Sequence, residues 1–227
     1  MKTSVIFDMD GTLFQTNKIL ELSLDETFCH LRLLNLWDAD TPIDTYRKIM
    51  GVPLPTVWET LLPEHSNEIR KQTDIYFLEK LVANIKSGNG ALYQNVHEIF
   101  RFLKENDCDI FIASNGLTEY LQTIVTYYNL DKWVTETFSI QQIHTLNKGD
   151  LVKSIIDKYD IKAGAVVGDR ISDISAAKDN GLVSIGCNFD FANETELAHA
   201  DYIINNLNEL QRLIDKIDLD SGRISKI

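Results

Sequence analysis

Short apolar runs, rich in β-branched residues, recur along the chain and predict the strands of a buried sheet. Each run is only a few residues long, and most of them end at a glycine or a polar residue, which is typical of buried strands in parallel sheets. The runs are SVIF (4–7), CDIFIA (108–113), GAVVG (164–168), LVSIGC (182–187) and DYIIN (201–205).

Apolar residues with helical spacing fill the intervals between these runs. They recur three or four positions apart, so that one face of each helix is apolar. Strands that alternate with helices predict an α/β fold built on a doubly wound parallel sheet. Around the second run the residues with this spacing are Val96, Ile99, Phe100 and Leu103 before it, and Leu117, Leu121, Ile124 and Val125 after it.

The first interval is much longer, because residues 8–95 separate SVIF from the helix of VHEIFRFLKEND (96–107). A structureless loop of that length is uncommon in a compact domain, so we expect a folded insertion. Its pattern is helical, and the prolines and the glycine of IMGVPLPTVWETLLPE (49–64) break it into short pieces. Its two stripes are Ile19, Leu20, Leu24, Phe28, Leu31 and Leu34, and then Ile69, Thr73, Tyr76, Phe77, Leu81 and Ile85.

The predicted domains follow from this insertion. Residues 16–88 form a small α-helical cap, and residues 1–15 and 89–227 form the α/β core. We expect the chain to enter and leave the cap at FQT (14–16) and SGNG (87–90).

Composition narrows the class of protein. The 227 residues are 44% hydrophobic and 25% charged, as in ordinary globular proteins. A net charge of −12 without a Lys/Arg cluster argues against nucleic-acid binding. The three cysteines lack the spacing of a disulfide framework or zinc site, and no run is long enough to span a membrane. We therefore expect a cytoplasmic protein that binds neither nucleic acid nor a membrane. We expect it to be a monomer or a small homo-oligomer.

Polar residues follow the predicted strands, where ligands of parallel sheets bind. Asp8 and Asp10 follow the first run, Ser114 and Asn115 follow the second, and Asp169 follows GAVVG with Asp173 one turn later. Lys148 lies at the predicted start of the helix in LNKGDLVKSII (146–156). The sequence thus predicts one crevice lined by carboxylates and a lysine.

Such carboxylates repel, and each close pair costs roughly 4 kcal/mol at an effective dielectric constant near 20. Lys148 supplies one positive charge, and a divalent ion would supply the rest. Oxygen-only, carboxylate-rich sites favour Mg²⁺ over zinc. Lys148, the Ser114 hydroxyl and backbone N–H groups near Asn115 would then hold a phosphoryl group beside the ion.

Asp8 and Asp10 have different expected roles. Asp8, at the end of a strand, is placed to act as a nucleophile that forms an aspartyl-phosphate. Asp10 follows two residues later on the turn that Gly11 permits, so it can protonate the leaving oxygen and later deprotonate water.

Four motifs make the chain resemble phosphatases of the haloacid dehalogenase superfamily. They are DMDGT (8–12), Ser114 in IFIASN (110–115), Lys148, and GDRISD (168–173) followed by ISAAKDNG (174–181), in the family's order. The insertion after the first motif resembles the helical cap of phosphoglycolate phosphatases. Two departures affect local turns only: Gly149 replaces a frequent proline, and YQNVHEIF (93–100) replaces a proline-glycine turn.

The resemblance implies a phosphoric monoester hydrolase that uses Mg²⁺ and acts on a small phosphorylated metabolite of the phosphoglycolate, sugar phosphate or nucleotide type. It implies that Asp8 is the nucleophile, Asp10 the acid/base, and Ser114 and Lys148 the phosphoryl ligands. Mg²⁺ would be held by the Asp8 carboxylate, the Asp10 backbone carbonyl and Asp169, with Asp173 acting through bound water.

Several alternatives stay open. An inorganic pyrophosphatase or a phosphosugar mutase would share this architecture, whereas a dehalogenase would need neither Asp10 nor Mg²⁺. A phospho-accepting receiver module would be about half this length and lack a cap, and a silent binding module would not need the full set of catalytic residues. Ser114 and Asp173 are also suited to capping helices. Arg47 and Lys48 in the cap could bind an anionic substrate or lie on an exposed helix face.

Overall fold

The computed structural model describes residues 2–49, 52, 54–190, 192–214, 216 and 217. The chain divides into two compact units: Met1–Gln15 with Leu92–Ile227, here called the α/β unit, and Thr16–Ala91, called the helical unit. The chain leaves the α/β unit after Gln15 and returns to it at Leu92. The Gln15 side chain donates to the Leu92 carbonyl at 2.6 Å, so these two residues lie side by side. Of the residues predicted to break the helical pattern, Gly51 and Pro53 lie outside the described residues. Pro55 lies in the first turn of a short helix, Leu54–Leu61, and Pro63 follows the end of that helix.

The α/β unit is built on a parallel sheet, as predicted. Six strands in the described part of the chain pair in the order β3-β2-β1-β4-β5-β6. Each neighbouring pair is parallel. The strands are β1 (Ser4–Phe7), β2 (Asp109–Ser114), β3 (Glu136–Ser139), β4 (Gly164–Gly168), β5 (Val183–Cys187) and β6 (Tyr202–Ile204).

Strand β3 is the one element of this sheet that the apolar runs did not predict. Its sequence, ETFS, contains a single large apolar residue, and only Phe138 and Ser139 are buried. Because β3 pairs with β2 alone at the edge of the sheet, its pairing is set by the backbone and not by an apolar run.

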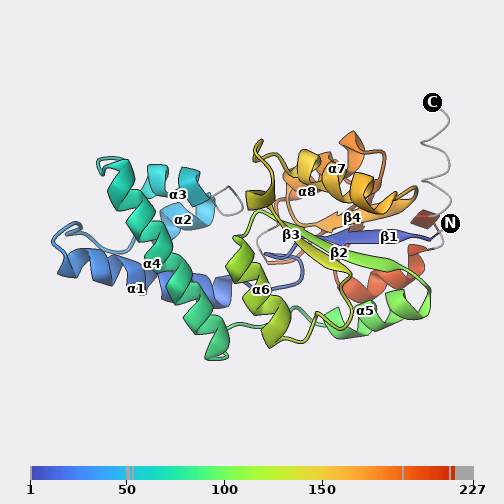
Figure 1. Ribbon diagram of the computed structural model, residues 1–227, viewed down its shortest axis with the longest axis horizontal. Coiled ribbons are helices and arrows are strands. Elements are labelled where there is room, and N and C mark those ends of the chain that lie inside the picture. The colour runs from blue at the N-terminus through green and yellow to red at the C-terminus, as the bar shows by residue number, and fades with distance from the viewer. Residues whose placement is uncertain (1, 50–51, 53, 191, 215, 218–227) are drawn as a thin grey trace. The chain divides into compact units, whose positions relative to one another are not determined.

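Helices cover both faces of this sheet. Figure 1 shows α7 and α8 on one face, and α5 and α6 on the other. The strands proceed from β1 outward to β3 and then from β4 outward to β6, so the order reverses between β1 and β4. Parallel sheets bind ligands outside the carboxyl ends of the strands at such a reversal. The helices are α5 (Val96–Glu105), α6 (Thr118–Tyr127), α7 (Lys148–Tyr159), α8 (Ile171–Asp179) and α9 (Glu194–Leu197), with 3₁₀ turns η1 (Ile140–Gln142) and η2 (Leu207–Arg212).

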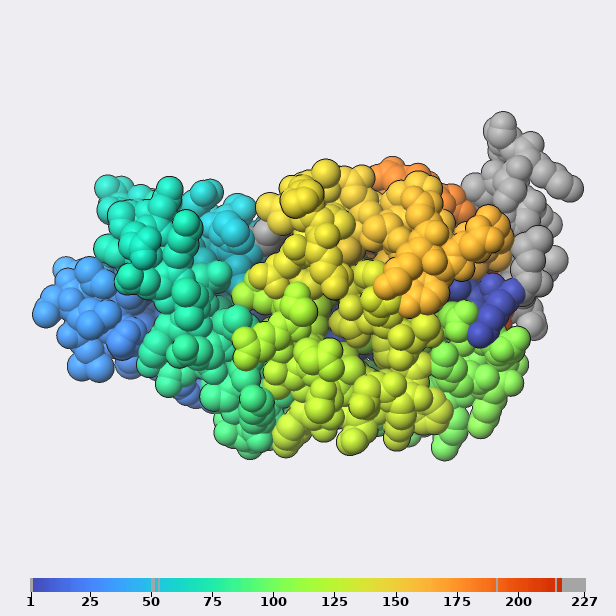
Figure 2. Space-filling model, viewed as in Figure 1, coloured from blue at the N-terminus to red at the C-terminus, as the bar shows by residue number. Residues whose placement is uncertain are grey.

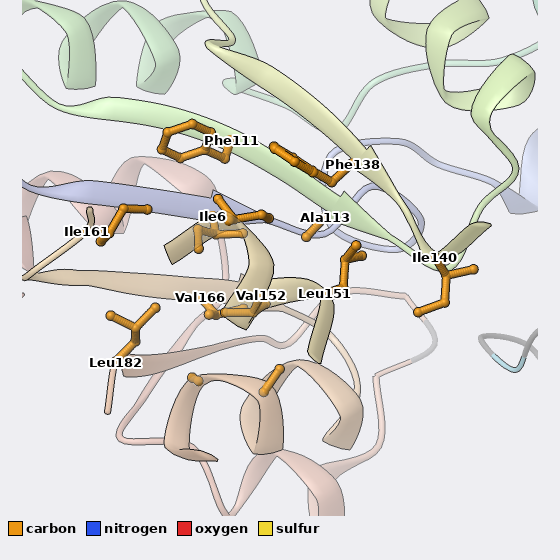
Figure 3. Packing of buried hydrophobic residues seen from close by; sticks show 13 residues of the cluster. Ile6, Phe111, Ala113, Phe138, Ile140, Leu151, Val152, Ile161, Val166 and Leu182 are labelled. Carbon is orange, nitrogen blue, oxygen red and sulfur yellow. The ribbon is translucent and has the colours of Figure 1, made fainter. Parts of the chain in front are cut away.

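The core under α7 and α8 holds the central strands rigidly. Ile6, Phe111 and Val166, from three neighbouring strands, belong to one buried cluster with Leu151 and Val152 of α7 (Figure 3). Strand β1 is fully buried, and little of it is visible among the side chains that cover the α/β unit in Figure 2. The residues that follow β1 and β4 therefore start from fixed positions.

The helical unit contains α1 (Asn17–Leu33), α2 (Ile43–Lys48), α3 (Leu54–Leu61) and α4 (Asn67–Lys86). Its two long helices follow the two predicted stripes and pack against each other. Leu34 was expected on the first stripe, but α1 ends before it and its side chain is 52% exposed. No helix in the described residues is long and apolar enough to cross a membrane.

Candidate active site

Asp8 follows strand β1 and lies at the carboxyl ends of the strands, where the strand order reverses between β1 and β4. The Asp8 amide continues the ladder by donating to the Val167 carbonyl of β4 at 2.8 Å. Its side chain is buried, with 7% of the residue exposed. The chain then turns at Gly11, whose φ of +78° suits glycine. A Cβ there would lie 2.5 Å from Asp169 Oδ2, so glycine is also needed for the turn to approach β4.

Strand β4 delivers Asp169, and α8 returns Asp173 toward the same place. Asp173 Oδ2 accepts from the Arg170 backbone N–H at 3.1 Å, which caps the start of α8. The side chain lies so close to β4 that a Cβ at Gly168 would be 2.1 Å from its Cγ. Asp173 therefore caps a helix and also contributes a buried carboxylate to the site.

Lys148 begins α7 and reaches two of these carboxylates. Its Nζ lies 2.6 Å from Asp8 Oδ1 and 2.5 Å from Asp173 Oδ1, and its side chain is 4% exposed. The preceding Asn147 caps α7 by accepting from the Gly149 and Asp150 amides. Proline at position 149 could not donate in this way, so this helix start uses the glycine as a donor.

The carboxylates form one buried cluster. Asp8, Asp169 and Asp173 offer oxygens that all lie within 4.8 Å of one another, and Thr12 Oγ1 donates to Asp169 Oδ1 at 3.4 Å. At that separation two ionised carboxylates repel by roughly 3 to 4 kcal/mol at an effective dielectric constant near 20. Lys148 offsets part of this repulsion.

Burial has the largest effect on the pKa values of Asp8, Asp169 and Lys148. Burial raises the pKa of Asp8 well above its usual value, against the opposing effect of Lys148. Burial and the Asp173 charge raise the pKa of Asp169 to about 7. Burial lowers the pKa of Lys148, but Asp173 and Asp8 outweigh that effect, so its pKa is raised and the ammonium is retained.

The cluster fits a hard divalent ion. All its donors are oxygens, which Mg²⁺ prefers. Two oxygens bound directly to one Mg²⁺ at about 2.1 Å lie at most about 4.2 Å apart. A spread of up to 4.8 Å is slightly wider, so the set would bind such an ion after a small side-chain movement or with one oxygen acting through water.

Ser114 and Asn115 lie at the end of β2, outside the carboxylate cluster. The pairing of Phe7 with Ile112 puts Ser114 beside the turn that carries Asp8 and Asp10. Ser114 is 1% exposed, and its Oγ accepts from the Gly116 amide at 3.0 Å. Leu117 occupies the position that caps α6, so Ser114 is not that cap. Asn115 is half-buried.

Asp10 lies next to the cluster and is held by a residue that the sequence did not identify. Its charge acts on Asp8, and its Oδ1 accepts a hydrogen bond of 2.5 Å from Tyr120 Oη on α6. Tyr120 lies far from Asp10 in the sequence. From the sequence alone it looks like an ordinary residue on the apolar face of a helix. Only the placement of α6 reveals the pairing.

Glu196 is a second residue that sequence patterns missed. Its Oε2 accepts from Arg170 Nε at 3.1 Å and from the Ile171 backbone N–H at 2.8 Å. It thereby fixes the loop between Asp169 and α8. In the helical unit, Arg47 forms ion pairs with Glu21 and Asp44, so its charge is already partnered.

Comparisons with known proteins agree with this geometry. The family model of haloacid dehalogenase-like hydrolases matches residues 5–187. The pyrophosphatase PpaX of Listeria welshimeri is 21% identical over 220 residues, covering 93% of this chain and 96% of that protein. The phosphoglycolate phosphatase of Pasteurella multocida is 20% identical over 221 residues, covering 92% and 96%.

Solved structures share the fold. The crystal structure of a predicted phosphoglycolate phosphatase from Haemophilus somnus matches with a TM-score of 0.81 at 20% sequence identity. The match covers 94% of this chain and 98% of that one.

Replacing Lys148 with methionine should destabilise the metal-free protein by about 3 kcal/mol at pH 7.5, because it leaves buried carboxylates without their ammonium. The loss should be smaller at pH 5, where those carboxylates can protonate. Urea unfolding at both pH values measures it. The control is Lys153→Met on the same helix, whose pair with Asp157 is exposed and should matter little. Equal effects of the two substitutions would contradict the prediction.

In the presence of EDTA, the free energy of unfolding should fall as pH rises from about 4 to about 7. The pKa of Asp169 is about 7 when folded. It is about 3.9 in an unfolded chain, so between these values the folded state binds the extra proton. Stability is thus highest below the unfolded pKa and is lost as pH rises through the folded one. The Asp169→Asn variant should lose this slope, on the order of 4 kcal/mol; an unchanged slope would assign it to other groups.

Proposed function

Because the chain belongs to the haloacid dehalogenase-like hydrolases, we propose that it is a magnesium-dependent phosphatase that hydrolyses a small phosphorylated metabolite through an aspartyl-phosphate on Asp8. Its relatives are phosphatases that act on phosphorylated substrates, and it is a hydrolase of that kind. The observation that carries the proposal is the buried pair of Asp8 and Lys148 beside Asp169 and Asp173.

In the first half-reaction a carboxylate oxygen of Asp8 bonds to phosphorus while the bond from phosphorus to the leaving oxygen breaks. The contact with Lys148 supports this role, because a nearby ammonium favours the ionised carboxylate that a nucleophile must be. Asp10 gives its proton to the leaving oxygen, so that an alcohol departs instead of an alkoxide.

In the second half-reaction water attacks the phosphorus of the aspartyl-phosphate. Asp10, now a carboxylate, accepts the proton from that water, and the bond between Asp8 and phosphorus breaks. Inorganic phosphate leaves, and both aspartates return to their starting states. One residue thus serves as acid and then as base.

Lys148, the Ser114 hydroxyl and Asn115 would bind the phosphoryl oxygens, because Lys148 contacts Asp8 from the start of α7 and the other two follow the neighbouring strand β2. The Asp8 carboxylate, the Asp10 backbone carbonyl and Asp169 would hold Mg²⁺, with Asp173 acting through water. That ion, when bound, would neutralise part of the carboxylate charge and the charge of the phosphoryl group.

We assign the helical unit the role of a cap that selects the leaving group. Its position as a folded insertion directly after the Asp8 motif supports this assignment. The phosphoglycolate, sugar phosphate and nucleotide classes are the substrates we consider. None of the described cysteines, Cys29, Cys108 and Cys187, forms a disulfide, which fits a cytoplasmic protein.

An inorganic pyrophosphatase is the second candidate, and its support is the similarity to PpaX. The charges of the site favour a monoester. Lys148 already contacts two carboxylates, and Arg170 is paired with Glu196. Among the described residues of the α/β unit, a second phosphate group would therefore meet little positive charge beside the cluster.

Asp8→Asn should reduce the magnesium-dependent release of phosphate from p-nitrophenyl phosphate by at least about 10³-fold, because an amide is a poor nucleophile. Asp157→Asn, an exposed aspartate on α7, is the control and should retain full activity. The Asp10→Asn variant should accumulate a phosphorylated enzyme detectable by mass spectrometry, since this substrate leaves without a proton but hydrolysis needs a base. Retained turnover in Asp8→Asn would refute the proposal.

A substrate panel separates the two candidates. We expect kcat/KM for at least one of phosphoglycolate, hexose phosphates and nucleoside monophosphates to exceed that for pyrophosphate by about tenfold or more, which corresponds to about 1.4 kcal/mol. Phosphate release with Mg²⁺ and with EDTA measures it. A preference for pyrophosphate would instead establish the second candidate.

A further inference from the structure

We propose that Tyr120 is a positioning residue for proton transfer by Asp10. The proposal rests on the phosphatase function above and adds a residue that lies outside the four motifs. Tyr120 does not touch the reacting atoms in this assignment. It acts by fixing the carboxyl group that exchanges the proton.

The carrying observation is the hydrogen bond from Tyr120 Oη to Asp10 Oδ1. Its length of 2.5 Å is at the short end of the range for hydrogen bonds between a hydroxyl donor and an oxygen acceptor. The bond connects α6 to the turn after β1. It therefore connects α6, the helix that follows β2, to Asp10, the proposed acid/base.

The phenol ring itself has little freedom. Tyr120 is 4% exposed, and its ring meets the Phe14 ring edge-on with centroids 6.4 Å apart. A Cβ at Gly116 would lie 3.1 Å from Tyr120 Cδ1, so glycine allows the ring to pack tightly against this loop.

The loop under the ring is also fixed. Gly116 donates its amide to Ser114 Oγ at 3.0 Å, and its carbonyl accepts from Ser139 Oγ at 2.6 Å. A continuous set of contacts thus connects Ser114, a proposed phosphoryl ligand, through Gly116 and Tyr120 to Asp10. The phosphate position and the acid/base position are set by one structure.

This arrangement assigns separate tasks to the two carboxyl oxygens of Asp10. Oδ1 accepts from Tyr120, so Oδ2 exchanges the proton with the leaving oxygen and then with water. Both transfers need the same oxygen at nearly the same place, and misplacement by about 1 Å can cost about 10²-fold in rate. A fixed phenol donor supplies that orientation without taking part in the chemistry.

Tyr128 provides a matched control. Its ring also packs against Phe14, with centroids 5.9 Å apart, but its buried hydroxyl has no hydrogen-bond partner among the described residues. Removing either hydroxyl leaves an aromatic ring in contact with Phe14. Only the Tyr120 substitution removes a contact with Asp10.

The test compares Tyr120→Phe with Tyr128→Phe on two substrates. A primary alkyl phosphate needs a proton on its leaving oxygen, whereas p-nitrophenolate leaves without one. We expect Tyr120→Phe to lower kcat/KM about tenfold for the alkyl phosphate and by less than about threefold for p-nitrophenyl phosphate. Tyr128→Phe should leave both values unchanged. The parameter kcat/KM reports the steps up to leaving-group departure, so hydrolysis of the phosphoenzyme does not mask the difference.

Equal losses on both substrates would mean a purely structural role, and unchanged values on both would mean none; either overturns the proposal. A wild-type enzyme inactive on every phosphomonoester would instead refute the proposed function. In that case crystal structures of the two variants decide the positioning role. Asp10 should change orientation or become disordered in Tyr120→Phe alone, and an unchanged Asp10 would overturn it.

Discussion

The contacts of Lys148 with Asp8 and Asp173 are the interaction on which the rest of the site depends. Three carboxylates whose oxygens lie within 4.8 Å of one another are buried around one ammonium. The repulsion within a single pair, roughly 3 to 4 kcal/mol, is a sizeable part of the 5–15 kcal/mol by which proteins of this kind are stable. The fold therefore has to bring in positive charge, and the start of α7 does so.

The sheet is the reason that the carboxylates lie close together. Asp8 and Asp169 follow neighbouring strands at the reversal of strand order, so they converge without any long flexible loop. The close approach is possible because Gly11 and Gly168 leave room where a Cβ would meet Asp169 or Asp173. The glycines of the first and last motifs thus have a packing role as specific as the chemistry of the aspartates beside them.

The features predicted from sequence are those encoded by nearby residues. The apolar runs that precede Asp8, Ser114 and Asp169 indicated the sheet and the end of it that carries the candidate site, because each run and the polar residue after it lie within a few positions of each other. Strand β3 escaped prediction because its pairing with β2 comes from backbone contacts at an edge. Tyr120 and Glu196 escaped for a related reason: each acts on a residue distant in sequence, and neither has a local pattern that distinguishes it.

The distinction between locally encoded features and long-range contacts also separates the proposed reacting groups from the residue that orients one of them. The carboxylates and the lysine that we assign to phosphoryl transfer come from the α/β unit, in motifs that relatives named for different substrates would need equally. The Tyr120 hydrogen bond arises outside those motifs, from a helix whose other buried residues only pack. In the proposed mechanism Asp10 delivers a proton and then takes one back, so the hydrogen bond from Tyr120 that orients it would bear on both half-reactions. Variation at position 120 would then be a route by which a fixed set of reacting groups is matched to leaving groups that differ in their need for a proton.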